Sequence, residues 1–436
     1  MVILTLEYCR KYNVTLVPEK TKLLAFSPDD SEFLTMYAKI ASPVNINGVY
    51  IPFSEEAGHV GILRSVHGNK PHLLDRLASH RKAMFCLLPV GTAKSHRGNP
   101  AATIRAERLF GIPVLLSGLA PLVLSSSDVS LLVGPFKRHM ERVLKLHDLT
   151  PECVIWFLAG CLPLEGHLHL RQMSLFGMLS RLRSGGNPLA AHARYIFSRD
   201  KIPPKSWFKQ ISNTFEKYAL PHPSEILTNP PPAETFKRVV KTAVLDYWNK
   251  KLRGQAGLLR SLKFFKPEFM SLTRTHPIFT SCENNPYEVK KAVVQARYLS
   301  GRGRIEALTK HWDTTNKEGH CLLCRMNDYQ VEGSLEHFLV PGGCPSLAAA
   351  RLSMLSMFNA YLVPRPYLFG ILKSCFQPQT PDLLMQFLLD CTAIPQVITM
   401  TQELKTLPIR NELLYLTRTY VFKMHCERRR LLSQDM

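Results

Sequence analysis

Three cysteines and one histidine in the C-terminal half have the residue types and the spacing of a zinc site. Cys321 and Cys324 form a C-x2-C pair, and His337 and Cys344 follow after 12 and 6 intervening residues. Zinc takes four tetrahedral ligands from thiolates and imidazoles, and a C-x2-C turn lets two sulfur atoms reach one ion. Two glycines directly before Cys344 permit a second tight turn. The spacing therefore predicts a structural zinc ion held by these four residues.

The same cysteines have a plainer interpretation as buried thiols, because the chain contains 11 cysteines in all. Their density favours the metal, since three cysteines and a histidine fall within 24 residues. His320 beside Cys321 and Glu336 beside His337 leave the choice of ligand open by one residue. A site with four protein ligands is closed and does not activate water. It would instead fold a small module that presents basic residues to nucleic acid.

Basic residues gather directly before the cysteines. Residues 233–310 contain 16 Lys or Arg and 6 Asp or Glu, a surplus of 10 out of the net charge of +21. Such a surplus favours a polyanionic partner, and the Arg-Gly-Arg run at 302–304 suits phosphate contacts. Tyr298 and Trp312 could stack on unpaired bases, although a solvated helical face remains the alternative. The candidate nucleic-acid-binding residues are Lys290, Lys291, Arg297, Arg302, Arg304 and Lys310.

The elements that must position these residues are mostly helical. Lys22–Phe26 and Val49–Phe53 have the composition of short strands, and Asn47-Gly48 of a turn. From Lys70 onward the apolar residues recur at helical spacing, which predicts a helical domain to about residue 220. Leu220–Pro232 then holds five prolines in 13 residues and would end any helix. The expected fold class is mostly α, with a small α+β N-terminal piece, a zinc-stabilised C-terminal module and a helical tail.

The segment Leu109–Ser127 carries no charge over 19 residues, which is the length of a membrane span. Pro113 and Pro121 would break a single helix, so two buried helical segments with a bend are expected instead. The opening residues lack the features of a secretory signal. The sequence thus indicates an intracellular, non-secreted protein with reduced thiols and no membrane partner, without separating nucleus from cytoplasm.

Three further groups of residues imitate catalytic or metal-binding motifs. His167 and His169 are interpreted as surface or core histidines. Asp29-Asp30 is interpreted as a solvated turn, since Pro28 would disrupt a strand there. Pro381-Asp382 with Asp390 could belong to a nuclease, but PDLLMQFLLD has the pattern of one amphipathic helix.

Four segments, in this order, resemble the C-terminal part of a non-LTR (LINE-type) retrotransposon reverse transcriptase. CRKYNVTLVPEKTKLLAF resembles the family's helix and Asn/Pro-x-Lys-Thr strand, with Pro18–Thr21 as the match. INGVYIPFSEEAGHVGILRS resembles the next hairpin, with His59–Gly61 at its signature. IPVLLSGLAPLVLS resembles the thumb segment, where Ser117-Gly118 replaces a Tyr-Gly pair. The Arg- and Gly-rich helix before C-x2-C resembles the zinc-binding segment that ends many of these polymerases.

The resemblance implies a domain order and two site assignments. Lys20 would occupy the place of a lysine that assists the departure of pyrophosphate, and the His59–Gly61 hairpin would grip the primer. The family's catalytic aspartates precede the Lys-Thr strand, so this chain is expected to lack them, and Mg²⁺ would serve only the intact polymerase. The implied domains are the end of the palm at 1–68, a thumb-like helical domain at 69–220, a Pro-rich break and basic linker at 221–310, the zinc-binding segment at 311–350 and the helical tail at 351–436.

The function that follows is nucleic-acid binding without polymerisation by the chain alone. Its expected partners are RNA or DNA and the N-terminal portion of the polymerase, while the oligomeric state is left open. Two alternatives also stay open at this point. One is a self-sufficient zinc-containing nucleic-acid-binding protein, and the other is a decayed element with no function.

Overall fold

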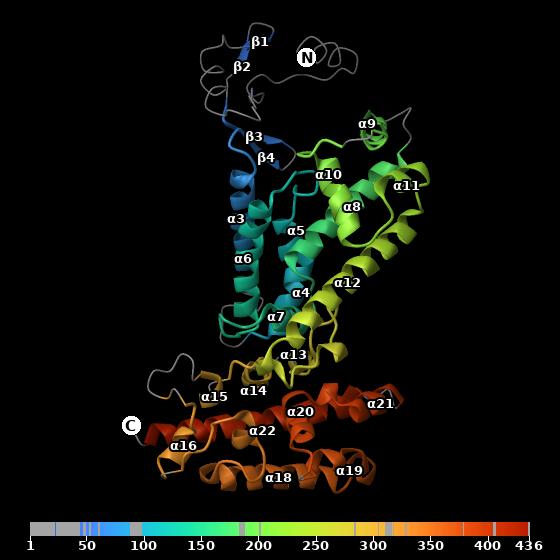
Figure 1. The fold of residues 1–436 in the computed structure, drawn as a ribbon. Helices are drawn as coiled ribbons and strands as arrows, with labels where there is room; N and C mark the ends of the chain where they lie inside the picture. The colour runs from blue at the N-terminus through green and yellow to red at the C-terminus, as the bar shows by residue number, and fades with distance from the viewer. Residues whose placement is uncertain are drawn as a thin grey trace.

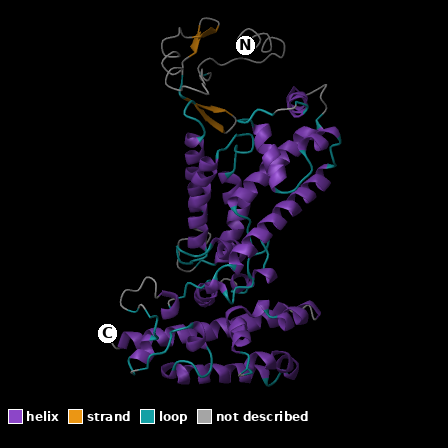
Figure 2. Cartoon of the chain, viewed as in Figure 1, coloured by secondary structure: helices purple, strands orange, loops and turns teal. Residues whose placement is uncertain are grey.

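The computed structural model describes residues 22, 44–46, 49–51, 54–59, 62–87, 98–182, 188–199, 202–282, 285–303, 305–309, 316, 318–327, 329–377, 379–403 and 407–434. Helices dominate this part of the chain, and its strands form two small hairpins (Figure 2). The expected mostly α class is therefore confirmed. Several residues discussed above lie outside the described part: Pro18–Thr21 with Lys20, Pro28, Asp29-Asp30, Asn47-Gly48, Val60-Gly61, Arg304, Lys310 and Trp312.

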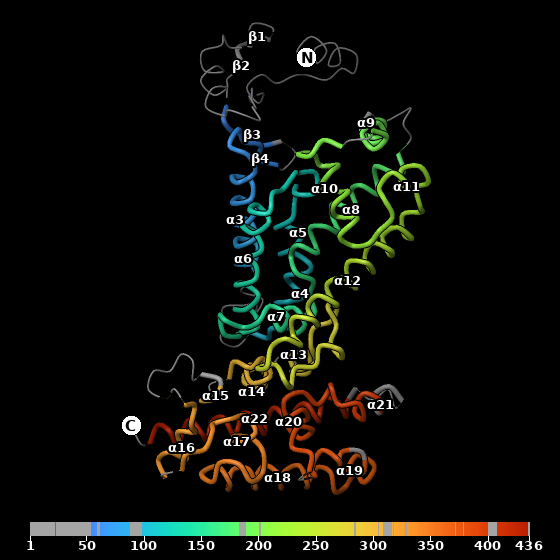
Figure 3. The backbone as a smooth tube through the Cα atoms, viewed as in Figure 1, coloured from blue at the N-terminus to red at the C-terminus, as the bar shows by residue number. Residues whose placement is uncertain are grey.

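The helices form two bodies, which Figure 1 shows one above the other. The first, here called the bundle, runs from α3 to α12. The second, here called the C-terminal module, runs from α14 to α22 and lies across the lower end of the bundle. The short helix α13 (Pro277–Thr280) contacts α4 of the bundle and α14 of the module. The backbone trace in Figure 3 passes from the bundle to the module once, through the segment that follows α12.

The hairpins precede the bundle, and the second one is fastened to it. The backbone N–H of Leu63 donates to Nδ1 of the buried His72 on α3 over 3.2 Å. The strand predicted at Val49–Phe53 is confirmed for its first three residues. The antiparallel pairs are β1 (Val44–Ile46) with β2 (Val49–Ile51), and β3 (Glu56–His59) with β4 (Ile62–Ser65).

The bundle buries the apolar positions that the helical spacing predicts. On its first helix, Leu73, Leu77 and Met84 are buried. Its helix α6 begins with a capping box in which Ser125 and Asp128 satisfy each other's backbone N–H groups. The bundle helices are α3 (Lys70–Cys86), α4 (Pro100–Ala106), the π-helix η3 (Glu107–Gly111), α5 (Ile112–Leu115), α6 (Ser126–Val143), α7 (Glu152–Ala159), α8 (Leu164–Arg181), α9 (Pro188–Phe197), α10 (Trp207–Lys217), α11 (Pro223–Thr228) and α12 (Ala233–Gly257).

Helix α12 packs along α8 through a narrow apolar stripe. Two glycines of α8 permit the close approach, since a Cβ at Gly177 would lie 2.3 Å from the ring of Phe236 and one at Gly166 would lie 2.8 Å from Trp248. The remaining faces of α12 carry the exposed Lys and Arg side chains of the basic block. The buried stripe of α12 repeats every fourth residue: Phe236, Val240, Val244, Trp248, Leu252 and Ala256.

The C-terminal module is arranged around its last helix. Helix α22 (Leu407–Gln434) packs against α14, α18 and α20, and residues Leu384–Asp390 of α20 are all buried. The module is helical as expected, and PDLLMQFLLD forms the predicted helix. Its other elements are α14 (Pro286–Leu299), α15 (Glu306–Thr309), α16 (Leu322–Arg325), α17 (Leu335–Leu339), η6 (Pro345–Leu347), α18 (Ala348–Leu362), α19 (Pro366–Leu372), η7 (Lys373–Phe376), α20 (Pro381–Asp390), η8 (Cys391–Ala393) and α21 (Pro395–Glu403).

Two predictions about loops need correction. The proline-rich break contains a short helix, α11, because Pro223 stands in its first turn, where a proline is tolerated. Within the apolar segment Leu109–Ser127, the helical stretch ends at Leu115 and a helix begins again only at Ser126; between them Gly118 adopts a positive φ of 75°. Its first residues, Leu109 and Phe110, are more than half exposed, so the prediction of two buried helices was wrong there.

Among the described helices, none is by itself both long and apolar enough to cross a membrane. The pair α7 and α8 satisfies the same criteria of length and composition only when taken together, with a bend of 63° between them.

The buried histidine of α8 makes the stability of the bundle depend on pH. His169 Nδ1 lies 2.8 Å from the hydroxyl of Tyr218, and burial lowers the pKa of His169 to about 4. An unfolded histidine titrates near pH 6.5, so below that pH the unfolded chain binds a proton that the folded chain excludes. The exclusion of this proton costs no stability above pH 6.5. As the pH falls from 6.5 toward 4, it lowers the free energy of unfolding by roughly 3 kcal/mol.

We therefore expect the free energy of unfolding, measured by urea titration, to fall between pH 7 and pH 5 by less in His169→Gln than in the wild type. His192→Gln is the matched control, because His192 is exposed on α9. An equal fall in the wild type and in His169→Gln would contradict this assignment.

Candidate metal centre and basic pocket

The four predicted zinc ligands are brought together by two short helices and the turns beside them. Cys321 directly precedes α16, and its N–H donates to Val331 O over 2.8 Å. Ser334 caps α17 by accepting from the N–H of His337, which orients the helix that carries this ligand. The N–H of Cys344 then donates back to His337 O over 2.7 Å.

A glycine closes the last of these turns. A Cβ at Gly343 would lie 2.1 Å from His337 O, so no other residue fits without moving the backbone. The glycines before Cys344 therefore have the structural role that the sequence indicated.

The ligand atoms have the separations of a tetrahedral metal site. The three Sγ atoms and the histidine nitrogen all lie within 4.8 Å of one another. Cys324 Sγ lies 3.7 Å from Cys344 Sγ and 3.2 Å from His337 Nε2. Zn–S bonds of about 2.3 Å at tetrahedral angles place two sulfurs about 3.8 Å apart, whereas a disulfide requires about 2.05 Å. This buried Cys3His group can hold a metal ion.

The neighbours of the ligands are not part of the cluster. His320 Nδ1 lies 3.1 Å from Glu318 Oε2, and Glu336 forms an ion pair of 3.4 Å with Lys263. The choice between adjacent residues thus falls on His337 and Cys321, as first predicted.

A buried arginine stands directly behind the ligands. Arg351 of α18 is 3% exposed, and its guanidinium donates to the carbonyl oxygens of Phe338 and Cys344. A divalent ion with three thiolates and a neutral imidazole has a net charge of −1, which one guanidinium neutralises. Hydrogen bonds from such an outer residue fix the orientation of the ligands.

The thiols influence one another while they are protonated. A hydrogen bond from Cys321 to Cys344 raises the pKa of the Cys321 thiol to about 12 and lowers that of Cys344. Burial raises the pKa of Cys324. All three must lose their protons to bind a metal, so binding weakens as the pH falls.

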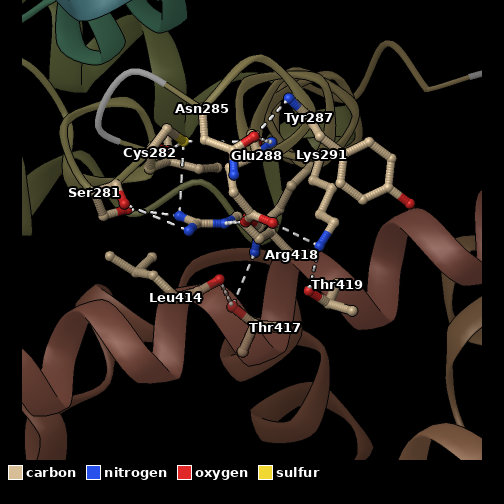
Figure 4. A network of polar contacts seen from close by, with 12 residues as sticks. Ser281, Cys282, Asn285, Tyr287, Glu288, Lys291, Leu414, Thr417, Arg418 and Thr419 are labelled. Atoms are coloured by element: carbon tan, nitrogen blue, oxygen red, sulfur yellow. Dashed lines mark hydrogen bonds and ion pairs between the residues drawn. The ribbon is translucent and has the colours of Figure 1, made fainter.

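The basic cluster predicted next to this site is divided by the fold, and one of its members is inside the protein. Lys291 is 4% exposed, with its Nζ 2.7 Å from Glu288 Oε1 and 3.1 Å from Thr419 Oγ1. Glu288 also accepts from Arg418 Nε over 2.6 Å, so α14 and α22 share one buried carboxylate between two cations (Figure 4). The prediction that Lys291 contacts nucleic acid was therefore wrong, because its ammonium is enclosed and paired.

Tyr298 is likewise part of the interior. It is 2% exposed, its hydroxyl lies 2.8 Å from His425 Nδ1, and a Cβ at Gly303 would lie 2.1 Å from its ring. Its prediction as a stacking platform for bases is corrected, because its side chain is almost completely buried.

The other described basic residues of the cluster remain near the surface. Lys290 is exposed, with its Nζ 5.6 Å from the centre of the Phe422 ring. Arg297 and Arg302 line a pocket of about 480 Å³ between the bundle and the module. Arg297 Nε donates to Lys145 O over 2.8 Å, which ties α14 to the end of α6. This cavity, here called the basic pocket, is also lined by His147, Asp148, His425 and Arg429.

Comparisons with known proteins give no relative: neither a protein-family model, nor a curated protein, nor a solved structure matches the chain.

Several residues of this region were not found from the sequence. Arg351, Arg429 and His425 approach the site from helices that follow it, and only the fold shows which face of each helix is turned inward. Glu306 accepts from the N–H of Leu322 over 3.2 Å and forms a buried ion pair with Arg428. The Glu-Arg-Arg-Arg run at 427–430 is evident in the sequence. The sequence does not show that Arg428 turns inward to Glu306 while Arg429 lines the basic pocket.

Arg351→Met should weaken the binding of zinc by about 10- to 100-fold, as is typical when an outer partner of the ligands is lost. The measurement is a competition with a zinc-binding dye on the full chain. Arg365→Met is the matched control, since Arg365 stacks on Tyr361 at the exposed end of α18. Equal affinities of the wild type and Arg351→Met would contradict the role given to this guanidinium.

Lys291→Met should lower the free energy of unfolding by about 2 kcal/mol, because it removes one hydrogen-bonded cation from a buried carboxylate. Lys290→Met changes the adjacent, exposed lysine and should leave stability unchanged within about 0.5 kcal/mol. The free energies of unfolding of both variants are measured by denaturant titration. Equal decreases in the two variants would show that the burial of Glu288 does not require Lys291.

Proposed function

We propose that the chain binds RNA or DNA through the phosphate backbone, at the basic pocket beside a zinc-stabilised module. The observation that carries this proposal is the convergence of Arg297, Arg302 and Arg429 on one cavity, with His147 and His425 on its walls. Guanidinium groups are suited to phosphate because their planar forks donate two parallel hydrogen bonds. The net charge of +21 gives the long-range attraction that such a contact needs.

A second basic surface supports the same partner. Helix α12 exposes Lys237, Arg238, Lys241, Lys250, Lys251 and Arg253 around its buried stripe. Of these, Lys237 is engaged by Glu234 over 2.9 Å. A polyanion that follows this helix toward its C-terminal end would meet contacts over a long path instead of at one point. Such extended contact with phosphates binds without reading sequence.

The metal in this proposal is zinc, with a structural role. Three soft thiolates and an imidazole match the ligand set of closed zinc sites, and each position of the tetrahedron is filled by the protein. The ion would hold α16, α17 and the turn at Cys344 together, since each of these pieces is too short to fold by itself. It would therefore act on nucleic acid only indirectly, by fixing the helices that line the pocket.

The resemblance to non-LTR reverse transcriptases supplies the setting that we propose. The bundle would correspond to the thumb, the β3–β4 hairpin to the motif that grips the primer, and the module to the zinc-binding end of the polymerase. The matched segments contain no pair of palm carboxylates, so nucleotidyl transfer and its Mg²⁺ are not assigned to them. The N-terminal polymerase portion would be the partner that supplies this chemistry.

The proposal is tested by the salt dependence of binding. For the full chain, we expect the logarithm of the affinity for a duplex DNA or a structured RNA to fall linearly with the logarithm of salt. Arg429→Ala should reduce the slope by about 0.9 for duplex DNA, which is the contribution of one phosphate contact. Fluorescence anisotropy over a series of salt concentrations measures both quantities.

The neighbouring arginine is the matched control. Arg430 belongs to the same helix but forms an ion pair of 2.6 Å with Glu427 and lines a different cavity. Arg430→Ala should therefore keep the wild-type slope. Binding that does not respond to salt would overturn the proposal, and so would an equal effect of the two substitutions on the slope. A chain that does not unfold cooperatively would instead favour a decayed element.

A further inference from the structure

A second cluster of residues of the types that bind metals lies inside the bundle, separate from the Cys3His group. His80 comes from α3, Glu107 from η3 and His139 from α6. His80 Nε2 lies 3.0 Å from Glu107 Oε2, and His139 Nε2 is hydrogen-bonded to the other carboxylate oxygen. The ligand atoms all lie within 4.8 Å of one another. The sequence gave no sign of this group, because 27 and 32 residues separate its members.

The backbone has an unusual shape where it delivers the carboxylate. Residues Glu107–Gly111 form a π-helix between α4 and α5, and such turns often occur at functional sites. The widened turn ends in a glycine, and a Cβ at Gly111 would lie 2.0 Å from Glu107 Oε2. Local sequence and backbone thus make room for this one side chain to point between the two imidazoles.

The carboxylate is buried without a permanent cation. Glu107 is 0% exposed, and its ion-pair partners among the described residues are the two histidines. An ionised carboxylate inside a protein is costly unless a positive charge accompanies it. A divalent cation would supply that charge.

The two histidines also line an open cavity, which gives an ion a way in. A pocket of about 520 Å³ lies between α3 and α6, with His80 and His139 on its wall and Phe136 beside them. Three arginines, Arg81, Arg138 and Arg142, stand around it, and all three are exposed. Their repulsion of a cation is screened by solvent and salt, whereas the buried carboxylate would bind it directly.

We propose that His80 Nε2, His139 Nε2 and the Glu107 carboxylate bind a divalent transition-metal ion such as zinc. Two imidazoles and one carboxylate form the donor set of open zinc sites, in which the fourth position is left to an exogenous ligand. Nitrogen and oxygen ligands at about 2.1 Å stand about 3.4 Å apart in a tetrahedron. The 3.0 Å contact of His80 with Glu107 has to widen by a few tenths of an ångström, and the shorter contact of His139 has to widen by more. The fourth position would face the pocket, where the arginines favour an anionic oxygen ligand.

This site differs from the Cys3His group in a way that can be seen by spectroscopy. Cobalt(II) bound by thiolates shows intense sulfur-to-metal charge-transfer bands, whereas cobalt bound by imidazoles and a carboxylate shows only weak ligand-field bands. The full chain, stripped of metal, is titrated with cobalt(II) while both regions of the spectrum are followed. We expect two equivalents in all, of which only one gives charge-transfer bands.

His139→Ala and Glu107→Gln should each lose the equivalent without charge-transfer bands and keep the other. His192→Ala, on the exposed histidine of α9, should keep both equivalents. Circular dichroism of each metal-free variant shows whether the fold is retained. A wild-type chain whose only bound equivalent gives charge-transfer bands would overturn the proposal even if a variant failed to fold. Folded variants that still bind the equivalent without such bands would overturn it as well.

Discussion

A single carboxylate joins the two helices on which the C-terminal module is built. Glu288 of α14 lies between Arg418 and Lys291, and Arg418 NH1 also donates to Ser281 Oγ over 2.8 Å (Figure 4). Charges buried in this way stabilise a fold only when every partner is in place, because any one left alone must do without water. The network therefore fixes one register of α22 against α14. Any shift by a turn would leave a charged group unsatisfied.

The Cys3His group and the basic pocket both depend on that register of α22 against α14. Tyr420 donates to Leu339 O over 2.6 Å, and Arg428 pairs with Glu306 beside Cys321, so two positions along α22 hold the Cys3His segment from one side. The next residue, Arg429, faces the pocket together with His425. The buried ion pairs, the contacts with the Cys3His segment and the lining of the basic pocket are thus contributed by different faces of one helix.

Local signals in the sequence were sufficient for the long helices and for the grouping of the Cys3His residues, but not for α11 or the segment Leu109–Ser127. The spacing of four ligands within one segment is visible without a fold, as is the helical pattern of PDLLMQFLLD. The burial of Lys291 could not be predicted from the sequence. Lys290 is exposed and Lys291 is buried because α22 packs against one face of α14. The His80, Glu107 and His139 cluster was missed for the same reason. Its members are ordinary residues of three helices until tertiary packing brings their side chains together.

The position of α22 in the chain also bears on how the protein is made. Its residues close the cores of α14, α18 and α20, so the buried segment Leu384–Asp390 has no complete partner surface until residues 407–434 have left the ribosome. The bundle precedes the module in the chain, and its helices pack largely on one another. The module, in contrast, must wait with its thiols and apolar helices uncovered. A nascent chain that stops short of α22 would therefore expose the apolar side chains of Leu384–Asp390.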